Sequence, residues 1–334
     1  MIFDFNASVF EEAHFDTLKQ ILVLLGQEQH FVITQNLKDD YDKWVFEKEP
    51  FKSYFGKYEL QDLSKKLQKK ANITTLHKQF LTKIVIGNNE NEVSPYNALR
   101  ILKERSLLLV ENKLNEKKFL KGICDKYTNH PKRKSIYVLI QKAFENEWIG
   151  TEGGGTGDMK KNLEYYVGSL QFQNIECYKL FMIFDNDKEK VNGTLANTQK
   201  KMIGFIKNVD KSENTNWETT DKIIWHIWHK RALENYAPLE QVFIKIYGLT
   251  NEQKEYLQNL QPSTLDFLKY DKSNTGLKEE KIKEKFPEIF EMNFSYQLLE
   301  KRCEHHKISF ETNNGNVIEI SEIEQILLKI AKII

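Results

Sequence analysis

The chain has 334 residues, of which 40% are hydrophobic and 12% aromatic, so it can form two or three folded domains and is not a disordered chain. Charged residues make up 29%, but the formal net charge of +1 excludes a polycation, so any nucleic acid must bind at a local basic patch. No apolar run approaches the roughly 18 residues of a membrane span, no signal peptide opens the chain and the three cysteines show no disulfide spacing, so we expect a cytoplasmic protein that contacts no membrane.

The first 93 residues predict a small α/β unit. Residues 2–5 have the composition of a short strand. Apolar side chains at helical spacing predict a helix over residues 10–25, which ends at Gly26. The other elements expected in this unit are a second strand over residues 30–34 and a lysine-rich helix over residues 57–85.

A linker over residues 87–93 leads into a central region, which we place at residues 94–248. Ser94 and Pro95 begin its first helix as N-cap and first helical residue. Strand-like runs then alternate with helical segments, which predicts a parallel sheet with helices on both faces. The expected strands are residues 107–110, 148–152, 180–184 and 222–228, and the expected helices are residues 115–125, 131–147, 158–167 and 191–205.

Residues 249–334 predict a mostly helical region that contains one β-hairpin. The hairpin signal is Asn314-Gly315, which lies between two strand-like segments. Capping pairs mark the starts of two helices, at Thr250 with Gln253 and at Ser321 with Glu324. We therefore expect an α/β fold with an N-terminal α/β unit, a central parallel sheet and this helical C-terminal region.

Acidic side chains follow two of the expected central strands. Glu111 follows residues 107–110, and Asp185 and Asp187 follow residues 180–184. The carboxyl ends of parallel strands form one edge of a sheet, which is where α/β proteins place their sites. Carboxylate oxygens suit Mg²⁺ or Mn²⁺, and two such ions about 4 Å apart can stabilise the attacking and leaving oxygens of phosphodiester cleavage. We predict that Asp185 and Asp187 bind metal and that Glu111 binds metal or activates water.

Two further segments are candidate phosphate contacts. Gly154 and Gly155 belong to a glycine cluster before the helix expected at residues 158–167, and their backbone N–H groups could bind phosphate. A tight strand-to-helix turn has the same composition, and the cluster lacks the Gly-Lys-Ser/Thr of a Walker A loop. Lys230 and Arg231 are predicted phosphate contacts beside the last central strand, where a solvated strand end would look the same.

The central segments together resemble a TOPRIM domain. The residues that carry the resemblance are Val110-Glu111 followed by Phe119, the triplet Asp185-Asn186-Asp187 after an apolar strand, and Leu233-Glu234-Asn235-Tyr236. The chain is most similar to TOPRIM nucleases of the overcoming-lysogenization-defect type and to their stand-alone relatives in bacterial anti-phage systems. The resemblance implies that Glu111, Asp185 and Asp187 bind Mg²⁺ or Mn²⁺ and cut nucleic acid, with Glu234 as a further metal ligand. It covers about 140 of the 334 residues and does not explain either flank.

The resemblance implies a metal-dependent endonuclease for DNA or RNA that acts as the toxic effector of an anti-phage defence system. Because the chain has no ATPase motif, a separate ATPase or sensor protein is the expected partner, and a homo-oligomer is left open. A topoisomerase-like enzyme would need a tyrosine nucleophile in another domain, which no stretch identifies.

Two departures from the family favour a different class, a TOPRIM-like scaffold that docks a partner without catalysis. Asn112 stands where the family has glycine, and Asn115 stands where a second carboxylate is common. Glu116 or Glu152 could replace the missing carboxylate. A divalent-metal nuclease is the prediction, and the scaffold is its alternative.

Overall fold

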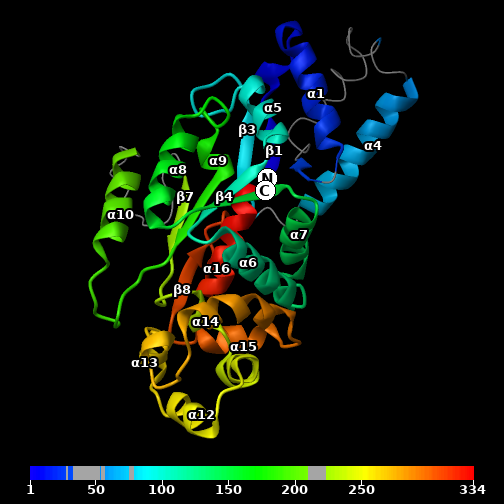
Figure 1. Ribbon diagram of the computed structural model, residues 1–334. Coiled ribbons are helices and arrows are strands. Elements are labelled where there is room, and N and C mark those ends of the chain that lie inside the picture. Colours follow the sequence, from blue (N-terminus) through cyan, green and yellow to red (C-terminus); the bar gives the residue numbers. More distant parts are fainter. Residues whose placement is uncertain (28, 33–52, 54–56, 75–78, 210–222) are drawn as a thin grey trace.

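The computed structural model describes residues 1–27, 29–32, 53, 57–74, 79–209 and 223–334. The chain forms two parallel β-sheets flanked by helices, followed by a helical C-terminal region with one antiparallel hairpin (Figure 1). The α/β fold class expected from the sequence is therefore confirmed. None of the described helices combines the length and the apolar composition that crossing a membrane requires.

The N-terminal sheet contains three parallel strands in the order β2-β1-β3. These strands are β1 (Ile2–Phe5), β2 (Phe31–Val32) and β3 (Lys83–Ile86). Two helices, α1 (Phe15–Leu25) and α5 (Pro95–Lys103), bury apolar side chains in the same hydrophobic cluster as these strands. The expected opening of the chain, a strand followed by a helix that ends near Gly26, is confirmed.

One part of this unit differs from the expectation. We predicted a single helix over residues 57–85, whereas helix α4 (Lys57–Thr74) is followed by strand β3. The β-branched run Ile84, Val85 and Ile86 favours a strand, and pairing with β1 satisfies its backbone groups. The ends of two expected strands, at residues 33, 34 and 222, lie outside the described residues.

The central sheet has four parallel strands in the order β5-β4-β6-β7. They are β4 (Ser106–Val110), β5 (Ile149–Gly153), β6 (Leu180–Phe184) and β7 (Ile224–Ile227), close to the positions expected from the sequence. The two middle strands, β4 and β6, are buried along their whole length, which explains their continuous apolar sequences.

Different helices cover the two faces of the central sheet (Figure 1). Alternate side chains of a strand point to opposite faces, so Leu107 of β4 belongs to one hydrophobic cluster and Leu108 to another. One cluster includes α8 (Thr156–Gly168) and α10 (Asn197–Val209), and the other includes α6 (Lys113–Tyr127) and α7 (Lys134–Glu145). The short helix α9 (Glu176–Lys179) leads into β6.

The helix expected over residues 191–205 begins later than predicted. Residues 191–196 form a turn and a loop before α10, and the Gly193 N–H donates to the Lys190 carbonyl at 2.8 Å. This turn lengthens the loop that follows β6 at the carboxyl edge of the sheet. The loop therefore starts at the acidic triplet and ends where α10 begins.

The C-terminal region contains short helices and a hairpin. The helices are α11 (Ile244–Tyr247), α12 (Asn251–Gln258), α13 (Pro262–Leu265), α14 (Glu279–Lys285) and α15 (Tyr296–Arg302), and the strands are β8 (Lys307–Glu311) and β9 (Val317–Ser321). The predicted hairpin is confirmed, and Gly315 in its turn has φ +76°, a left-handed conformation that glycine adopts without strain. The predicted capping box of Thr250 with Gln253 is also confirmed.

The last helix, α16 (Glu322–Ile333), packs inside the fold, and residues 322–331 are all buried. Its apolar side chains belong to the same hydrophobic cluster as β4 and β6 of the central sheet. Helix α5 likewise shares its cluster with the N-terminal sheet. The core thus joins segments that the predicted limits 1–93, 94–248 and 249–334 separate, and those limits stay a prediction.

Candidate metal centre at the carboxyl edge of the central sheet

The structure brings Glu111 and Asp185 together at the carboxyl edge of the central sheet. Each is the first residue after a middle strand, Glu111 after β4 and Asp185 after β6. The two strands pair in parallel, so their ends lie side by side. The Asp185 N–H donates to Glu111 Oε1 at 3.3 Å.

Asn186 anchors the acidic triplet to the end of β7. Its side chain is buried, and its amide nitrogen donates to the carbonyls of Trp228 and His229, both at 2.7 Å. Its amide oxygen accepts the Lys188 N–H at 2.8 Å. These bonds fix the backbone on both sides of Asn186 and so position the two flanking aspartates.

Asp187 is exposed and has φ +54°, a left-handed conformation that is uncommon for residues other than glycine. Its N–H lies 3.4 Å from the Arg231 carbonyl, and its carboxylate accepts a hydrogen bond from Gln199 Nε2 at 2.7 Å. Gln199 is fully buried at the start of α10. Such backbone strain persists where surrounding bonds enforce it, and it is frequent at functional sites.

Asp185 lies at the centre of a group of five carboxylates. Burial raises the pKa of its carboxyl well above the usual value, and four neighbouring carboxylates raise that pKa further. These neighbours are Glu111, Glu116, Glu234 and Asp187. Although Asp185 as a residue is partly exposed, its Oδ1 atom is buried and has no hydrogen-bond partner among the described residues. We call these five residues the carboxylate cluster.

Glu116 is one of the two carboxylates, with Glu152, that the sequence analysis names as possible replacements for the carboxylate that Asn115 lacks. It is only 2% exposed, on the first turn of α6, and its Oε2 accepts the Asn112 N–H at 2.6 Å. Burial raises the pKa of Glu116 to about 8; the Asn112 N–H opposes this rise and the charge of Glu111 adds to it. Its second oxygen, Oε1, is buried and has no hydrogen-bond partner within the described chain.

The carboxylate cluster fits a divalent metal ion by its donor chemistry. All its donors are carboxylate oxygens, the ligands that Mg²⁺ and Mn²⁺ prefer, and two of these oxygens are buried without a hydrogen-bond partner among the described residues. A cation would also relieve the repulsion that raises the pKa of Asp185. Within the described residues, no three His, Cys, Asp or Glu side chains are already gathered as metal ligands.

The predicted glycine loop lies at the same edge of the sheet, because β5 is the neighbour of β4. Gly153 has no room for a side chain, since an added Cβ would lie 2.6 Å from the Lys113 nitrogen. Gly154 and Gly155 lead into α8, where Asp158 occupies the first turn. This acidic residue already provides negative charge at the helix N-terminus, so the role of the two glycines as phosphate contacts stays a prediction.

Glu152 and Lys230 both have other partners. Glu152 pairs with Lys113 at 3.1 Å. Lys230 is fully buried, and its ammonium group pairs with Asp266 and donates to the Arg302 carbonyl at 2.7 Å. Both side chains are thus engaged in ion pairs, and the role of Lys230 as a phosphate contact stays a prediction.

Arg231 is half-buried and lies next to the acidic triplet. Its guanidinium donates to the Lys188 carbonyl at 3.0 Å, and its N–H donates to the Asp266 carbonyl at 2.9 Å. Of the two predicted basic residues, Lys230 pairs with Asp266, whereas Arg231 contacts the loop that carries Asp187.

Two residues that stabilise the carboxyl edge of the central sheet were not predicted from the sequence. Gln199 has no local signal, since only the fold brings α10 to Asp187. Asp266 accepts hydrogen bonds from Lys230, from Arg302 at 3.3 Å and from His306 at 2.9 Å, and Lys230 lies far along the chain from the other two. Asn186 had a signal, because it stands between the two aspartates of the motif.

Comparisons of this chain with protein-family models, with curated proteins and with solved structures give no match. The resemblance to TOPRIM nucleases stays a prediction from the motifs named above.

Proposed function

We propose that this protein is a Mg²⁺- or Mn²⁺-dependent nuclease that cleaves phosphodiester bonds at the carboxylate cluster. The observation that carries the proposal is the environment of Asp185. A buried carboxylate oxygen without a hydrogen bond lies at the meeting point of two parallel strands, among four further acids. Such a group is costly to keep ionised in a folded protein unless a proton or a cation neutralises it, and a divalent ion is the neutralising group that we propose.

In this proposal the chain holds the ion with Asp185, Asp187 and Glu111, and Glu116 and Glu234 supply further negative charge. A bound divalent ion supplies Lewis-acid stabilisation of phosphate charge and lowers the pKa of water. Asn186 and Gln199 position the ligands through their bonds to the end of β7 and to Asp187. Arg231 lies beside the cluster as the contact for a substrate phosphate.

The resemblance further supports a role as the toxic effector of an anti-phage defence system. We place the protein in the cytoplasm, where free cysteines such as the buried Cys124 and Cys303 are usual. A separate ATPase or sensor protein would release its activity, because the sequence shows no ATPase motif of its own.

The test is cleavage by the purified protein. With Mn²⁺ it should degrade plasmid DNA, single-stranded DNA or RNA, and Asp185→Ala and Asp187→Ala should abolish both cleavage and toxicity to cells. Asp62→Ala is the control, because Asp62 is exposed on α4 and pairs with its helix neighbour Lys66 at 2.6 Å. Cleavage and toxicity that survive both cluster variants would refute the proposal.

The alternative is a partner-binding scaffold of the same fold. Asn112 favours it, because its side chain caps α6 by accepting the Asn115 N–H at 3.2 Å, which is a structural role. Calorimetric titration with Mn²⁺ separates the two candidates. A nuclease requires an affinity that depends on Asp185, whereas a scaffold shows no such dependence.

A further inference from the structure

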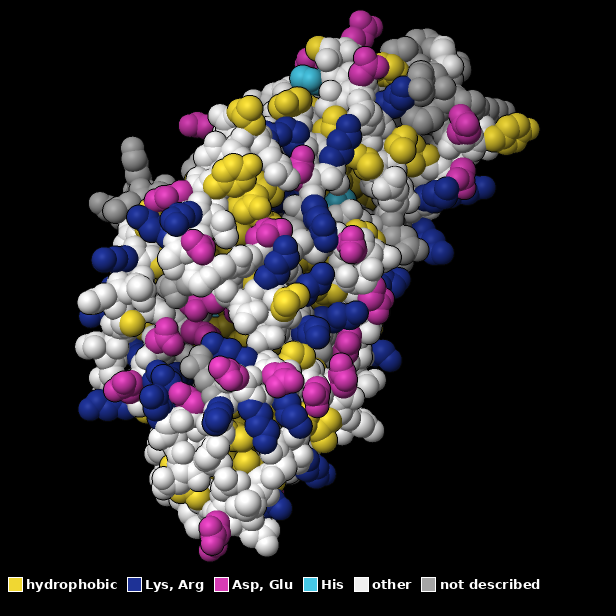
Figure 2. All heavy atoms as spheres, in the orientation of Figure 1, with side chains coloured by type: hydrophobic (Ala, Val, Ile, Leu, Met, Phe, Trp, Pro, Cys, Tyr) yellow, Lys and Arg dark blue, Asp and Glu magenta, His cyan; other side chains and the backbone are white. Residues whose placement is uncertain are grey.

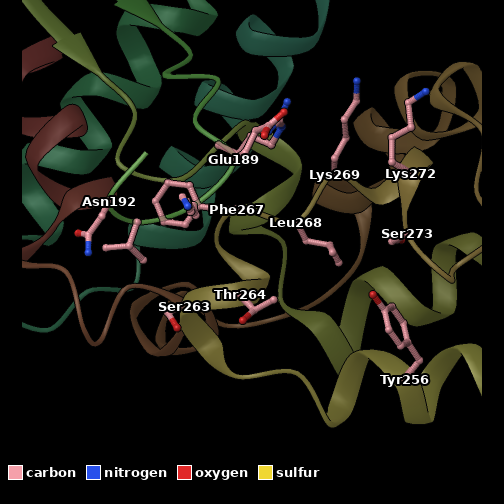
Figure 3. A pocket seen from close by; sticks show the side chains of 13 residues that line it. Glu189, Asn192, Tyr256, Ser263, Thr264, Phe267, Leu268, Lys269, Lys272 and Ser273 are labelled. Atoms are coloured by element: carbon pink, nitrogen blue, oxygen red, sulfur yellow. The ribbon is translucent and has the colours of Figure 1, made fainter. Parts of the chain in front are cut away.

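A cavity of about 630 Å³ is lined by Arg231, whose carbonyl lies 3.4 Å from the N–H of Asp187 in the carboxylate cluster. Figure 3 shows the side chains that line this cavity. Its walls come from three parts of the chain: residues 189–192 of the loop after β6, Arg231 after β7, and residues between 256 and 273. The first wall is the direct continuation of the acidic triplet. The cavity and the cluster therefore share one loop.

Arg231 connects the cavity to the cluster. Its carbonyl lies 3.4 Å from the Asp187 N–H, and its guanidinium donates to the Lys188 carbonyl at 3.0 Å. The same residue lines the cavity. A polymer bound with one phosphate at the cluster would thus pass Arg231 as it enters the cavity.

The cavity is basic, although the molecule as a whole is nearly neutral. Four cationic side chains line it, Lys190, Arg231, Lys269 and Lys272, together with one carboxylate, Glu189, and Lys269 also pairs with Asp271 at 3.9 Å. In Figure 3 the side chains of Lys269 and Lys272 extend in the same direction, away from Tyr256. Elsewhere on the face in Figure 2, basic and acidic side chains are interspersed. Such a local group of cations can attract phosphates without a large net charge.

The shape and remaining lining suit a nucleotide. The volume lies within the roughly 300–1,000 Å³ that is typical of pockets for small organic ligands. A cavity of this size is too small to hold a nucleic-acid duplex. Tyr256 is half-buried in the wall, and an aromatic ring there can stack on an unpaired base. The exposed Ser263 and Thr264 add hydroxyl groups that can donate to phosphate oxygens.

We infer that this cavity binds unpaired nucleotides next to the bond that the cluster cuts, so that the substrate is single-stranded nucleic acid or an unpaired segment. The inference rests on the proposed function, because it takes the cluster as the point of cleavage. Phosphates would be held by Lys190, Arg231, Lys269 and Lys272, and a base would stack on Tyr256. A paired strand cannot enter, since its bases are occupied and its partner strand collides with the wall.

The experiment measures binding without cleavage. Fluorescence anisotropy is recorded in EDTA for a labelled 12-nucleotide oligothymidylate, for the matching oligouridylate, and for the same strand in a duplex. The wild-type chain should prefer a single strand of DNA or RNA to the duplex by on the order of 10-fold. Lys269→Ala combined with Lys272→Ala, and separately Tyr256→Ala, should weaken single-strand binding by about 10-fold.

The matched control is Lys281→Ala combined with Lys301→Ala, which removes two exposed lysines from α14 and α15 outside the cavity. It should leave the preference for single strands unchanged. Equal losses in the cavity and control variants, or an equal loss of duplex and single-strand binding, would overturn the inference. Binding of adenosine monophosphate as tight as that of the oligonucleotide would also overturn it, because the cavity would then hold a free nucleotide.

Because the measurement contains no metal, it separates this inference from the nuclease. Suppose that the cavity variants bind single strands as the wild type does, while cleavage depends on Asp185. This result would refute the inference about the cavity and support the proposed nuclease. Suppose instead that single-strand binding depends on the cavity, but the protein cuts nothing with Mn²⁺. This result would support the cavity as a nucleic-acid site and refute the proposed nuclease.

Discussion

Asp185 lies in an environment that disfavours the ionised form of its carboxyl group. Burial and the surrounding acids raise its pKa, so the ionised form destabilises the metal-free fold, and this loss grows as the pH rises through the folded-state pKa. The bonds that place it come from its own backbone and from Asn186. A residue kept in such a position against the stability of the fold is typical of a functional site.

We therefore predict that Asp185→Asn stabilises the metal-free protein. In EDTA at pH 8 the free energy of unfolding should rise by about 1 kcal/mol or more, because the neutral amide carries no charge into the cluster. Mn²⁺ at about 100 times its Kd should stabilise the wild type by about 2.7 kcal/mol and leave the variant unchanged. Differential scanning calorimetry with and without Mn²⁺ measures both effects.

The control for this prediction is Asp62→Asn on the exposed face of α4. It should change neither the stability in EDTA nor the response to Mn²⁺. If Asp185→Asn instead lowers the stability in EDTA, the wild-type carboxyl makes a favourable contact and the prediction is wrong.

Helix α6 depends on one close approach to the C-terminal region. An added Cβ at Gly122 would lie 2.3 Å from Cβ and 2.7 Å from Cγ of Phe290, so the segment over residues 286–291 packs directly on the helix backbone. Phe290 also stacks edge-to-face on Phe119 of the same helix, with ring centroids 4.9 Å apart. The contact fixes α6, and with α6 the position of Glu116.

We predict that Gly122→Ala destabilises the protein by about 1–3 kcal/mol through this clash, although alanine is the better helix former by about 1 kcal/mol. Gly204→Ala is the matched control, because Gly204 lies in α10 and an added Cβ there meets nothing within 4 Å. It should stabilise the protein by roughly 0.5–1 kcal/mol. Urea unfolding of the two variants gives the comparison, and a stabilised Gly122→Ala protein would contradict the packing.

The first residue of α16, Glu322, holds this helix to the end of β7. Its carboxylate is fully buried and accepts hydrogen bonds from His226 Nε2 at 2.8 Å, the His229 N–H at 2.7 Å and the Tyr236 hydroxyl. Burial works against the charged form, but the charge of His229 and the bond from His226 lower the pKa of Glu322 to about 2. Burial and the neighbouring Lys329 lower the pKa of His226 to about 4, so His226 is neutral at pH 7 and acts through its hydrogen bond.

These two groups predict a loss of stability in acid. Both folded-state pKa values lie below the unfolded values, so the stabilisation is complete above about pH 6.5 and is lost as the pH falls toward 2. Glu322→Gln should cost on the order of 3 kcal/mol at pH 7 and flatten the pH dependence below pH 5. Glu319→Gln, at an exposed position of β9, should keep the wild-type profile. Denaturant unfolding from pH 3 to pH 8 tests this, and an unchanged profile in Glu322→Gln would refute it.

The molecule as a whole is joined through its C-terminal region. Helix α16 fills the core beneath β4 and β6, and Asp266 gathers Lys230 and Arg302 into one buried ionic group next to Arg231. The carboxyl edge of the central sheet is therefore supported by residues far along the chain. Removing one partner of such a buried group leaves charges without compensation.

We predict that a fragment of residues 1–248 does not fold on its own, because it lacks α16 and exposes the apolar face that this helix covers. It should be insoluble or lack near-ultraviolet circular dichroism, whereas co-expression with residues 249–334 should restore a soluble, folded complex. A fragment that folds alone would contradict the shared core and support the domain limit after residue 248.

Much of this architecture follows from local sequence patterns. The continuous apolar runs of β4 and β6 indicate buried parallel strands, and the hairpin at Gly315 has a local turn signal. The acids Glu111 and Asp185 could be predicted to meet because strand ends share one edge. Strand β3 was not recognised, because its short β-branched run follows a long helical pattern.

The sequence by itself determined the alternation of strands and helices, and with it the edge on which Glu111, Asp185 and Asp187 stand. Only the tertiary structure decided which side chains surround them: the buried Glu116, the bond from Gln199 to Asp187, the pairing of Lys230 with Asp266 and the cavity beside Arg231. The physical reason is the distance along the chain over which each effect acts. Periodicity and turn chemistry act over a few neighbouring residues, whereas burial, charge repulsion and ion pairing depend on segments that meet only when the whole chain packs.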